Sequence, residues 1–135
     1  MTERVFSADE KALCEVIAFT EQELEKSGCS IKAVMQITVA IEEIFVNIAR
    51  YAYPEDKGEV RYSIDFESRK NEITFRMKDN GIQFNPLKKP DPDITLTAEE
   101  RKIGGLGIYI MKKTMDEVSY AYEKGENILT MVKKL

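Results

Sequence analysis

Apolar residues recur at helical spacing in two long stretches of the first half of the chain. The first stretch follows Ser7-Ala8-Asp9-Glu10, a pattern typical of a capping box, and Gly28 is a plausible end of that helix. In the second stretch, Ser30 can cap a helix that runs from Ile31 to about Ala52. The apolar side chains of this second helix form one wide stripe, made of Val34, Ile37, Ile41, Ile44, Phe45 and Ile48.

Alternation of apolar and polar residues predicts two β-hairpins. The first hairpin pairs residues 60–66 with residues 73–77 across a polar turn at 68–71. The second pairs residues 118–122 with residues 128–132 around a turn at Gly125. In addition, Arg4–Phe6 is short and alternating enough to form an edge strand.

Residues 80–103 break the regular pattern, because they hold three prolines and few periodic apolar positions. A loop of this length inside a compact domain is usually functional or disordered. Within it, Thr97–Glu100 can start one short helical turn. A third helix is then predicted from about Gly105 to Met115, and its inward-facing residues are Ile108, Met111 and Met115.

The order of elements is helix, helix, two strands, long loop, helix, two strands. This order indicates an α/β fold, a two-layer sandwich whose mixed or mostly antiparallel sheet is covered by about three helices. It lacks the strict strand–helix alternation of a doubly wound fold. The length of 135 residues predicts a single domain over residues 1–135.

The amino-acid composition excludes several kinds of functional site. The 20 basic and 24 acidic residues give a net charge of −4, which argues against nucleic acid as the main partner but allows a local site for a small phosphate ligand. The absence of histidine excludes a Ser-His-Asp or Cys-His triad, a histidine-ligated metal and a phospho-accepting histidine in this sequence. The two cysteines, Cys14 and Cys29, are expected to be free thiols in a reducing compartment.

The expected location is the cytoplasm, without a membrane partner. No apolar run approaches the roughly 18 residues that cross a bilayer. The N-terminal residues lack the order of a charged region followed by an apolar region that marks a signal peptide.

The first candidate for chemistry lies on the second helix. At about 100° per residue, Glu43 and Asn47 are roughly 40° apart, and Arg50 lies about 20° to the other side of Glu43. This face is nearly opposite the apolar stripe. It offers a carboxylate that can accept a proton and an amide oxygen that suits Mg²⁺. The alternative is a solvated face with an i,i+4 pair.

The second candidate is the end of the first hairpin, where the sequence reads Asp79-Asn80-Gly81. Asp79 keeps the parity of the apolar residues of its strand, so it points to the apolar side of the sheet and needs a partner there. An exocyclic amine such as that of adenine would serve, and Gly81 would let a flat ring approach the backbone. The alternative is a turn that merely ends a strand.

The third candidate is Gly104-Gly105-Leu106-Gly107, which directly precedes the third helix. Backbone N–H groups at a helix N-terminus attract phosphate. The segment is neither a Walker A loop nor a dinucleotide-binding G-x-G-x-x-G. A flexible hinge explains the glycines equally well.

Taken together and in this order, the three segments resemble the N, G1 and G2 boxes of the GHKL (histidine kinase-like) ATPase superfamily. The N box would be residues 43–47, the G1 box Asp79-x-Gly81, and the G2 box Gly105-Leu106-Gly107. Residues 104–118, G-G-L-G-I-Y-I-M-K-K-T-M-D-E-V, look closest to the small bacterial anti-sigma factors that are also serine protein kinases, the RsbW/SpoIIAB-like group. The resemblance extends from about residue 5 to the end of the chain.

The resemblance implies a Bergerat-type fold that binds ATP or ADP with Mg²⁺ between helices and sheet. In that scheme Glu43 is the catalytic base and Asn47 holds Mg²⁺. Asp79 and Gly81 meet the adenine, and residues 87–103 form the ATP lid. The phosphates are expected to contact Gly104, Gly105, Leu106 and Gly107, with Arg50 as a further ligand.

One departure from the family concerns the cation before the G2 glycines. Some relatives carry an arginine immediately before them, whereas here the segment reads Arg101-Lys102-Ile103. Either cation could take over that role.

Partners also follow only from the resemblance: a sigma factor, a small antagonist (anti-anti-sigma) protein that carries the acceptor serine, and a second copy in a homodimer. Two functions of different class remain. One is a serine protein kinase that switches partners, and the other is a non-catalytic, nucleotide-dependent sequestering module. An ATPase or kinase with another protein substrate is a third possibility. An intact Glu43 favours the kinase, because binding alone needs no base.

Overall fold

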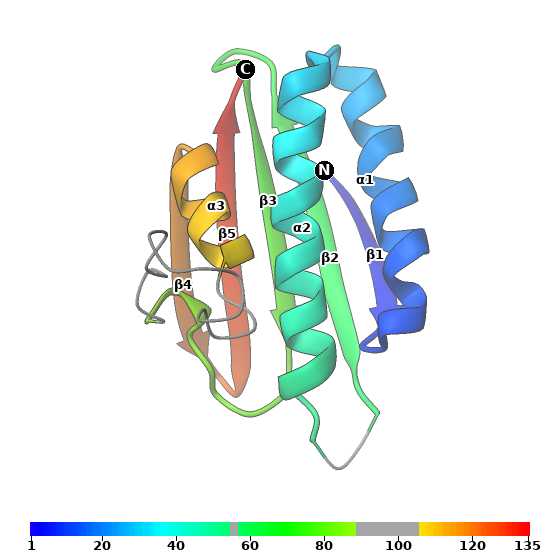
Figure 1. Ribbon diagram of the computed structural model, residues 1–135, viewed down its shortest axis with the longest axis vertical. Coiled ribbons are helices and arrows are strands. Elements are labelled where there is room, and N and C mark those ends of the chain that lie inside the picture. The colour runs from blue at the N-terminus through cyan, green and yellow to red at the C-terminus, as the bar shows by residue number, and fades with distance from the viewer. Residues whose placement is uncertain (55–56, 89–105) are drawn as a thin grey trace, which may run out of the picture.

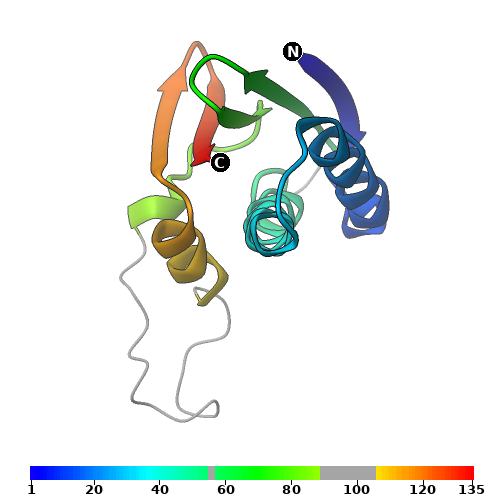
Figure 2. The same cartoon turned by 90° about the horizontal axis from the view of Figure 1, so that it is seen from above.

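A computed structural model describes residues 1–54, 57–88 and 106–135 of the chain. Within them, five strands form one sheet and three α-helices lie on one of its faces (Figures 1 and 2). The helices are α1 (Leu13–Ser27), α2 (Ile31–Tyr51) and α3 (Leu106–Thr114). The strands are β1 (Thr2–Ser7), β2 (Glu59–Glu67), β3 (Glu72–Asp79), β4 (Glu117–Glu123) and β5 (Glu126–Lys134). Two short 3₁₀ helices, η1 (Glu10–Ala12) and η2 (Pro86–Lys88), complete the described elements.

The strand order across the sheet is β1-β2-β3-β5-β4. Every pairing among these strands is antiparallel, so the α/β sandwich predicted from sequence is confirmed and the sheet is antiparallel throughout its described part. Both predicted hairpins are present, β2–β3 and β4–β5. Because β3 lies beside β5, Asp79 and Asn127 occupy directly opposed positions at the end of two neighbouring strands.

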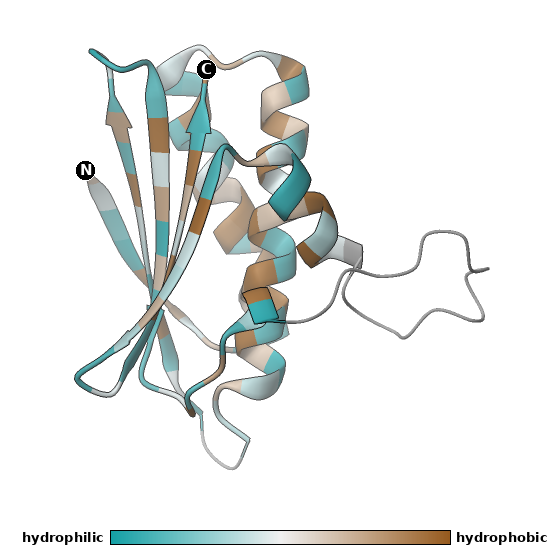
Figure 3. Ribbon diagram, turned by 90° about the vertical axis from the view of Figure 1, so that its left-hand side faces the viewer, coloured by the Kyte–Doolittle hydropathy of each residue, from teal (hydrophilic) through white to brown (hydrophobic). Residues whose placement is uncertain are grey.

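The core fills the space between the sheet and the helices, where apolar side chains of both layers meet. Hydrophobic residues, brown in Figure 3, recur along the strands and the helices of the two layers. The apolar stripe of α2 is buried over the sheet, and Ile37, Ile41 and Ile44 are at most 1% exposed. On α3, the predicted inward residues Ile108 and Met111 are also fully buried. Burial of these large apolar side chains is the main force that fixes α2 at the centre of the helical layer.

A cluster of aromatic side chains packs α1 against the β1–β2 edge of the sheet. The ring of Phe19 lies 5.8 Å from that of Phe6 and 5.4 Å from that of Tyr62. The Tyr62 hydroxyl and the Thr20 hydroxyl are 2.7 Å apart in a buried hydrogen bond. Burial raises the pKa of Tyr62 well above its usual range, so this side chain stays neutral.

Helix boundaries follow local signals in α2 but not at the start of α1. Ser30 caps α2 by accepting a hydrogen bond from the backbone N–H of Ala33, as predicted. Gly28 ends α1 with a φ of 70°, also as predicted. The predicted capping box at Ser7 is wrong, because Ser7 belongs to β1 and Asp9 instead caps η1 through the N–H of Lys11.

Two expectations fall on residues that the structure does not describe. Nearly all of the expected ATP lid, residues 87–103, and the whole expected helical turn at Thr97–Glu100 lie outside the described residues. Within the described part of the chain, no helix has the length and apolarity needed to cross a membrane.

Candidate active site

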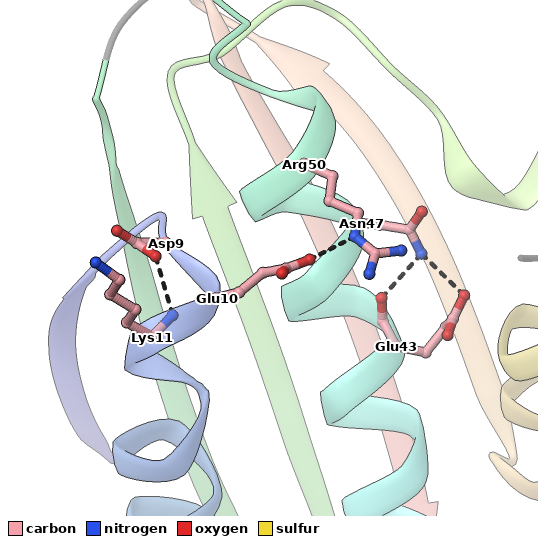
Figure 4. Close-up of polar contacts among 6 residues, drawn as sticks. All are labelled: Asp9, Glu10, Lys11, Glu43, Asn47 and Arg50. Atoms are coloured by element: carbon pink, nitrogen blue, oxygen red, sulfur yellow. Dashed lines mark hydrogen bonds and ion pairs between the residues drawn. The ribbon is translucent and has the colours of Figure 1, made fainter.

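Glu43 and Asn47 form the first part of the candidate site, one helical turn apart on α2 (Figure 4). The Asn47 side-chain Nδ2 donates to the backbone carbonyl of Glu43 at 2.8 Å and to its carboxylate Oε1 at 3.1 Å. Asn47 is only 7% exposed and Glu43 is partly buried, so this pair does not belong to a fully solvated surface. The helix therefore presents a carboxylate and an amide in direct contact, as its spacing predicts.

Arg50 lies on the other side of this pair and points toward η1 (Figure 4). Its guanidinium Nε donates to Oε1 of Glu10, and its side chain is about half exposed. The hydrogen bond and the charge of Glu10 raise the pKa of Arg50, while the charge of Glu43 contributes a smaller effect. The predicted contact of Arg50 with phosphate stays a prediction, since the hydrogen bond described for this guanidinium goes from Nε to Glu10.

Asp79 ends β3 with its carboxylate buried on the helical side of the sheet, 3% exposed. Its Oδ1 accepts hydrogen bonds from the backbone N–H of Gly81 and from Nδ2 of Asn127, both at 2.9 Å. Burial raises the pKa of Asp79, and these two bonds partly oppose that rise. A buried carboxylate held in this way is a specific acceptor for a ligand donor.

Gly81 lies against the end of α2. A Cβ at this position would be 2.2 Å from the carbonyl oxygen of Ala52, which also accepts a hydrogen bond from the N–H of Ile82 at 2.9 Å. The Tyr53 hydroxyl supports the same turn by accepting from the N–H of Asn80 at 2.8 Å. Close packing against the backbone of Ala52 thus requires a glycine at position 81, independently of any contact between Gly81 and a ligand.

Gly107 lies in the first turn of α3 and faces Glu43. A Cβ on it would be 2.3 Å from Oε2 of Glu43. Gly104 and Gly105 lie outside the described residues, as do Arg101 and Lys102, and the described backbone of Leu106 starts the helix. Of the predicted glycine segment, the structure therefore brings Gly107 to the site.

Asn127 on β5 is a site residue that the sequence analysis missed. It is 6% exposed and its side chain joins Asp79 to the segment that follows β3. A single asparagine in an alternating strand gives no local signal of function. Its parity with the buried Leu129 and Met131 was the one available indication that its amide faces the core.

A pocket opens between α2 and the sheet and connects these groups. Asn47 borders it on the helix, while Asp79 and Asn127 border it on the sheet. Apolar side chains form the rest of its wall: Ile44, Ile48, Ala52, Met77, Ile82, Phe84, Pro86, Tyr120 and Leu129. An apolar slot with a few buried polar groups is the usual character of a small-molecule site.

The donor set fits Mg²⁺ only together with a ligand. Within the described residues, no group of three or more His, Cys, Asp or Glu side chains could hold a metal ion. Because the backbone carbonyl and Oε1 of Glu43 both accept from Nδ2 of Asn47, the amide oxygen of Asn47 points away from Glu43 (Figure 4). One amide oxygen matches the usual Mg²⁺ site, in which phosphates and water supply the other ligands.

Comparison with known proteins identifies the family of this chain. Residues 6–133 match the histidine kinase-like ATPase domain family. The curated serine-protein kinases RsbW of Bacillus thuringiensis and Bacillus cereus are 31% identical over 108 residues, which are 77% of this chain and 66% of the relatives. RsbW of Listeria monocytogenes is 26% identical over 109 residues, covering 77% of this chain and 68% of the relative. The chain therefore spans about two-thirds of the length of these relatives.

A solved structure supports the same fold. The RsbU and RsbW domains of a Mycobacterium tuberculosis protein match with a TM-score of 0.65, over 100% of this chain and 33% of that chain. The identity is 15%, so this likeness concerns the fold alone. Since the family match spans residues 6–133 and the curated relatives are RsbW kinases, this chain belongs to the histidine kinase-like ATPase domain family, in its RsbW-like branch.

Proposed function

We propose that this protein binds ATP with Mg²⁺ in the pocket between α2 and the sheet and transfers the γ-phosphoryl group to a serine of a small antagonist protein. Its other partner in this proposal is a sigma factor, which it binds and withholds as an anti-sigma factor. One observation carries the proposal: the pocket is bordered by Asn47 and Asp79, and Glu43 is hydrogen-bonded to Asn47 at its edge.

The sheet side of the pocket suits adenine. The buried Asp79 carboxylate can accept a hydrogen bond from the exocyclic amine, and the apolar walls at Ile48 and Met77 can cover the faces of a flat ring. Guanine has a carbonyl oxygen where adenine has this amine, so an ionised Asp79 would repel it. The pocket therefore favours adenine nucleotides over guanine nucleotides.

The helix side suits phosphoryl transfer. Glu43 takes the proton of the serine hydroxyl, whose oxygen then forms a bond to the γ-phosphorus. The bond from that phosphorus to the bridging oxygen breaks, and ADP leaves with its electron pair. Mg²⁺, where bound, would neutralise charge on the phosphates, and the amide oxygen of Asn47 would be a ligand for it.

Gly107 and the start of α3 add a second element to the helix side. The free backbone N–H groups of a helix N-terminus attract negative charge, and this one begins beside Glu43. Gly104 and Gly105 are proposed to extend this phosphate contact, with Leu106 between them and Gly107. Arg50 is proposed as a further phosphate ligand, through guanidinium N–H groups other than the Nε–H that Glu10 accepts.

The decisive experiment compares wild type with Glu43→Gln. Each protein is incubated with ATP labelled at the γ-phosphate and with small proteins that co-purify from the native host. Wild type should label a serine of one of them. Glu43→Gln should reduce that labelling about 100-fold or more, because the base is lost while the shape of the site is kept.

Nucleotide affinity supplies the control for this comparison. Since Glu43 is not among the groups proposed to hold adenine, Glu43→Gln should keep ATP affinity within a few-fold of wild type. If wild type binds ATP and labels no co-purified protein, the kinase proposal fails and a nucleotide-dependent sequestering module becomes the better account.

A further inference from the structure

The amide of Asn127 joins four separate groups at the sheet end of the pocket. Its Nδ2 donates to Oδ1 of Asp79 at 2.9 Å and to the carbonyl of Ile82 at 2.8 Å. Its Oδ1 accepts from the N–H of Phe84 at 3.1 Å and from the hydroxyl of Tyr120. The four partners come from β3, from β4 and from the segment after β3.

These four bonds fix the orientation of the amide. An asparagine side chain has two donor hydrogens and an oxygen with two lone pairs, and here all four positions are used. Reversing the amide would place Nδ2 against the two donors and Oδ1 against the Asp79 carboxylate. The reversed form is therefore strongly disfavoured, and a buried network satisfied in this way is rigid.

The orientation of Asn127 determines which Asp79 oxygen can meet a ligand. Both described hydrogen bonds to this carboxylate, from Asn127 and from Gly81, end on Oδ1. Within the described residues, Oδ2 is thus the oxygen left to accept a bond. The same amide also holds Ile82 and Phe84, which line the pocket beside Asp79.

We propose that Asn127 is a positioning residue for base recognition: its amide holds Oδ1 of Asp79 and the 82–84 segment, so that Oδ2 reads the 6-amino group of the nucleotide base. This inference rests on the proposed function, because it assumes that an adenine nucleotide occupies the pocket. It adds that selectivity for the 6-amino group depends on the Asn127 amide as well as on Asp79.

The test uses ADP and inosine diphosphate, which differ at position 6 of the base, where an amine is replaced by a carbonyl. Calorimetric titration with Mg²⁺ gives the ratio of the two affinities. Wild type should prefer ADP by about tenfold or more, the scale of one hydrogen bond to a charged group. In Asn127→Asp, a second carboxylate faces Asp79, the pair shares a proton, and the preference should fall at least about tenfold.

The ratio separates positioning from a purely structural role. A variant that only loosens the fold weakens both nucleotides in proportion and leaves their ratio unchanged. The matched control is Asn71→Asp, since Asn71 also donates through Nδ2 to a carbonyl, that of Leu135, but lies at an exposed turn. This control should keep the wild-type ratio.

Asn127→Ala covers the case in which Asn127→Asp does not fold, as judged by thermal melting. This substitution adds no charge. Water from the pocket can form hydrogen bonds with the groups that lose the Asn127 amide as their partner. Its preference for ADP should fall about threefold or more. An unchanged ratio in either folded variant overturns the role of Asn127. If wild type binds neither nucleotide, the proposed function itself fails, which is a different result.

Discussion

Gly107 on α3 and Glu43 on α2 are in such close contact that a Cβ on the glycine would lie 2.3 Å from Oε2 of the carboxylate. The first turn of α3 therefore sets the position of the proposed base. Two segments that are 64 residues apart in sequence meet here, and the smallest side chain is needed on one of them. Packing against Glu43 therefore explains why a glycine stands at position 107, independently of any contact with phosphate.

Gly107→Ala should displace Glu43 without unfolding the protein. The atom that the methyl group meets is the end of a flexible side chain, and alanine favours a helix by up to about 1 kcal/mol over glycine. The melting temperature should therefore change little, while phosphoryl transfer at saturating ATP falls about tenfold or more. In the double variant Glu43→Gln/Gly107→Ala, the two losses should not add, because both act through the same carboxylate. Additive losses would contradict this explanation.

Asp79→Asn should stabilise the nucleotide-free protein and weaken ADP binding. Burial raises the pKa of Asp79, so the ionised carboxylate costs stability at pH values above that pKa, and the cost disappears as the pH falls through it. The asparagine oxygen can still accept from Gly81 and Asn127. The variant should melt a few degrees higher than wild type at about pH 8, with a smaller difference at about pH 5. A lower melting temperature at about pH 8 would show that the charge is stabilising.

Gly81→Ala should destabilise the fold, in contrast to the change at Gly107. Here the added methyl group would meet the backbone oxygen of Ala52 at 2.2 Å, and a backbone atom cannot rotate away. We expect a loss of about 1–3 kcal/mol, measured by urea unfolding. Removing the Ala52 methyl group in Ala52→Gly/Gly81→Ala should restore only part of it, because the carbonyl remains. A single variant as stable as wild type would mean that the 79–82 turn yields easily.

Arg50→Gln distinguishes the sequence-based role of this residue from its place in the structure. Its guanidinium is paired with Glu10 and does not border the pocket. ADP affinity should therefore change less than about threefold, and stability by less than about 1 kcal/mol, as for an exposed ion pair. A tenfold loss of ADP affinity would show that Arg50 binds the phosphates, as the family resemblance implies.

Local signals predicted much of the fold. The helical spacing of α2, its cap at Ser30 and the end of α1 at Gly28 are all confirmed, since each depends on residues within a few positions. The predicted start of α1 was wrong because it depends on a contact between distant residues. Ser7 and Asp9 can both cap a helix, and only the pairing of Ser7 with Glu59 in the sheet decides between them.

Contacts between distant segments account for what the sequence did not predict about the site. Helical spacing placed Glu43 beside Asn47, which the hydrogen bond between them confirms. The same spacing could not reveal that Glu10 engages Arg50, because these residues are 40 positions apart. Asn127 was missed because its partner Asp79 lies 48 positions away, and the meaning of its amide appears only when β3 and β5 are paired.

Titration of the wild-type protein with ATP and with GTP, each with Mg²⁺, tests the central claim most directly. The claim is that the pocket between α2 and the sheet binds an adenine nucleotide through the buried carboxylate of Asp79. The account predicts that ATP binds at least about tenfold more tightly than GTP, and that Asp79→Asn removes most of this difference. Equal affinity of the wild-type protein for the two nucleotides would contradict it.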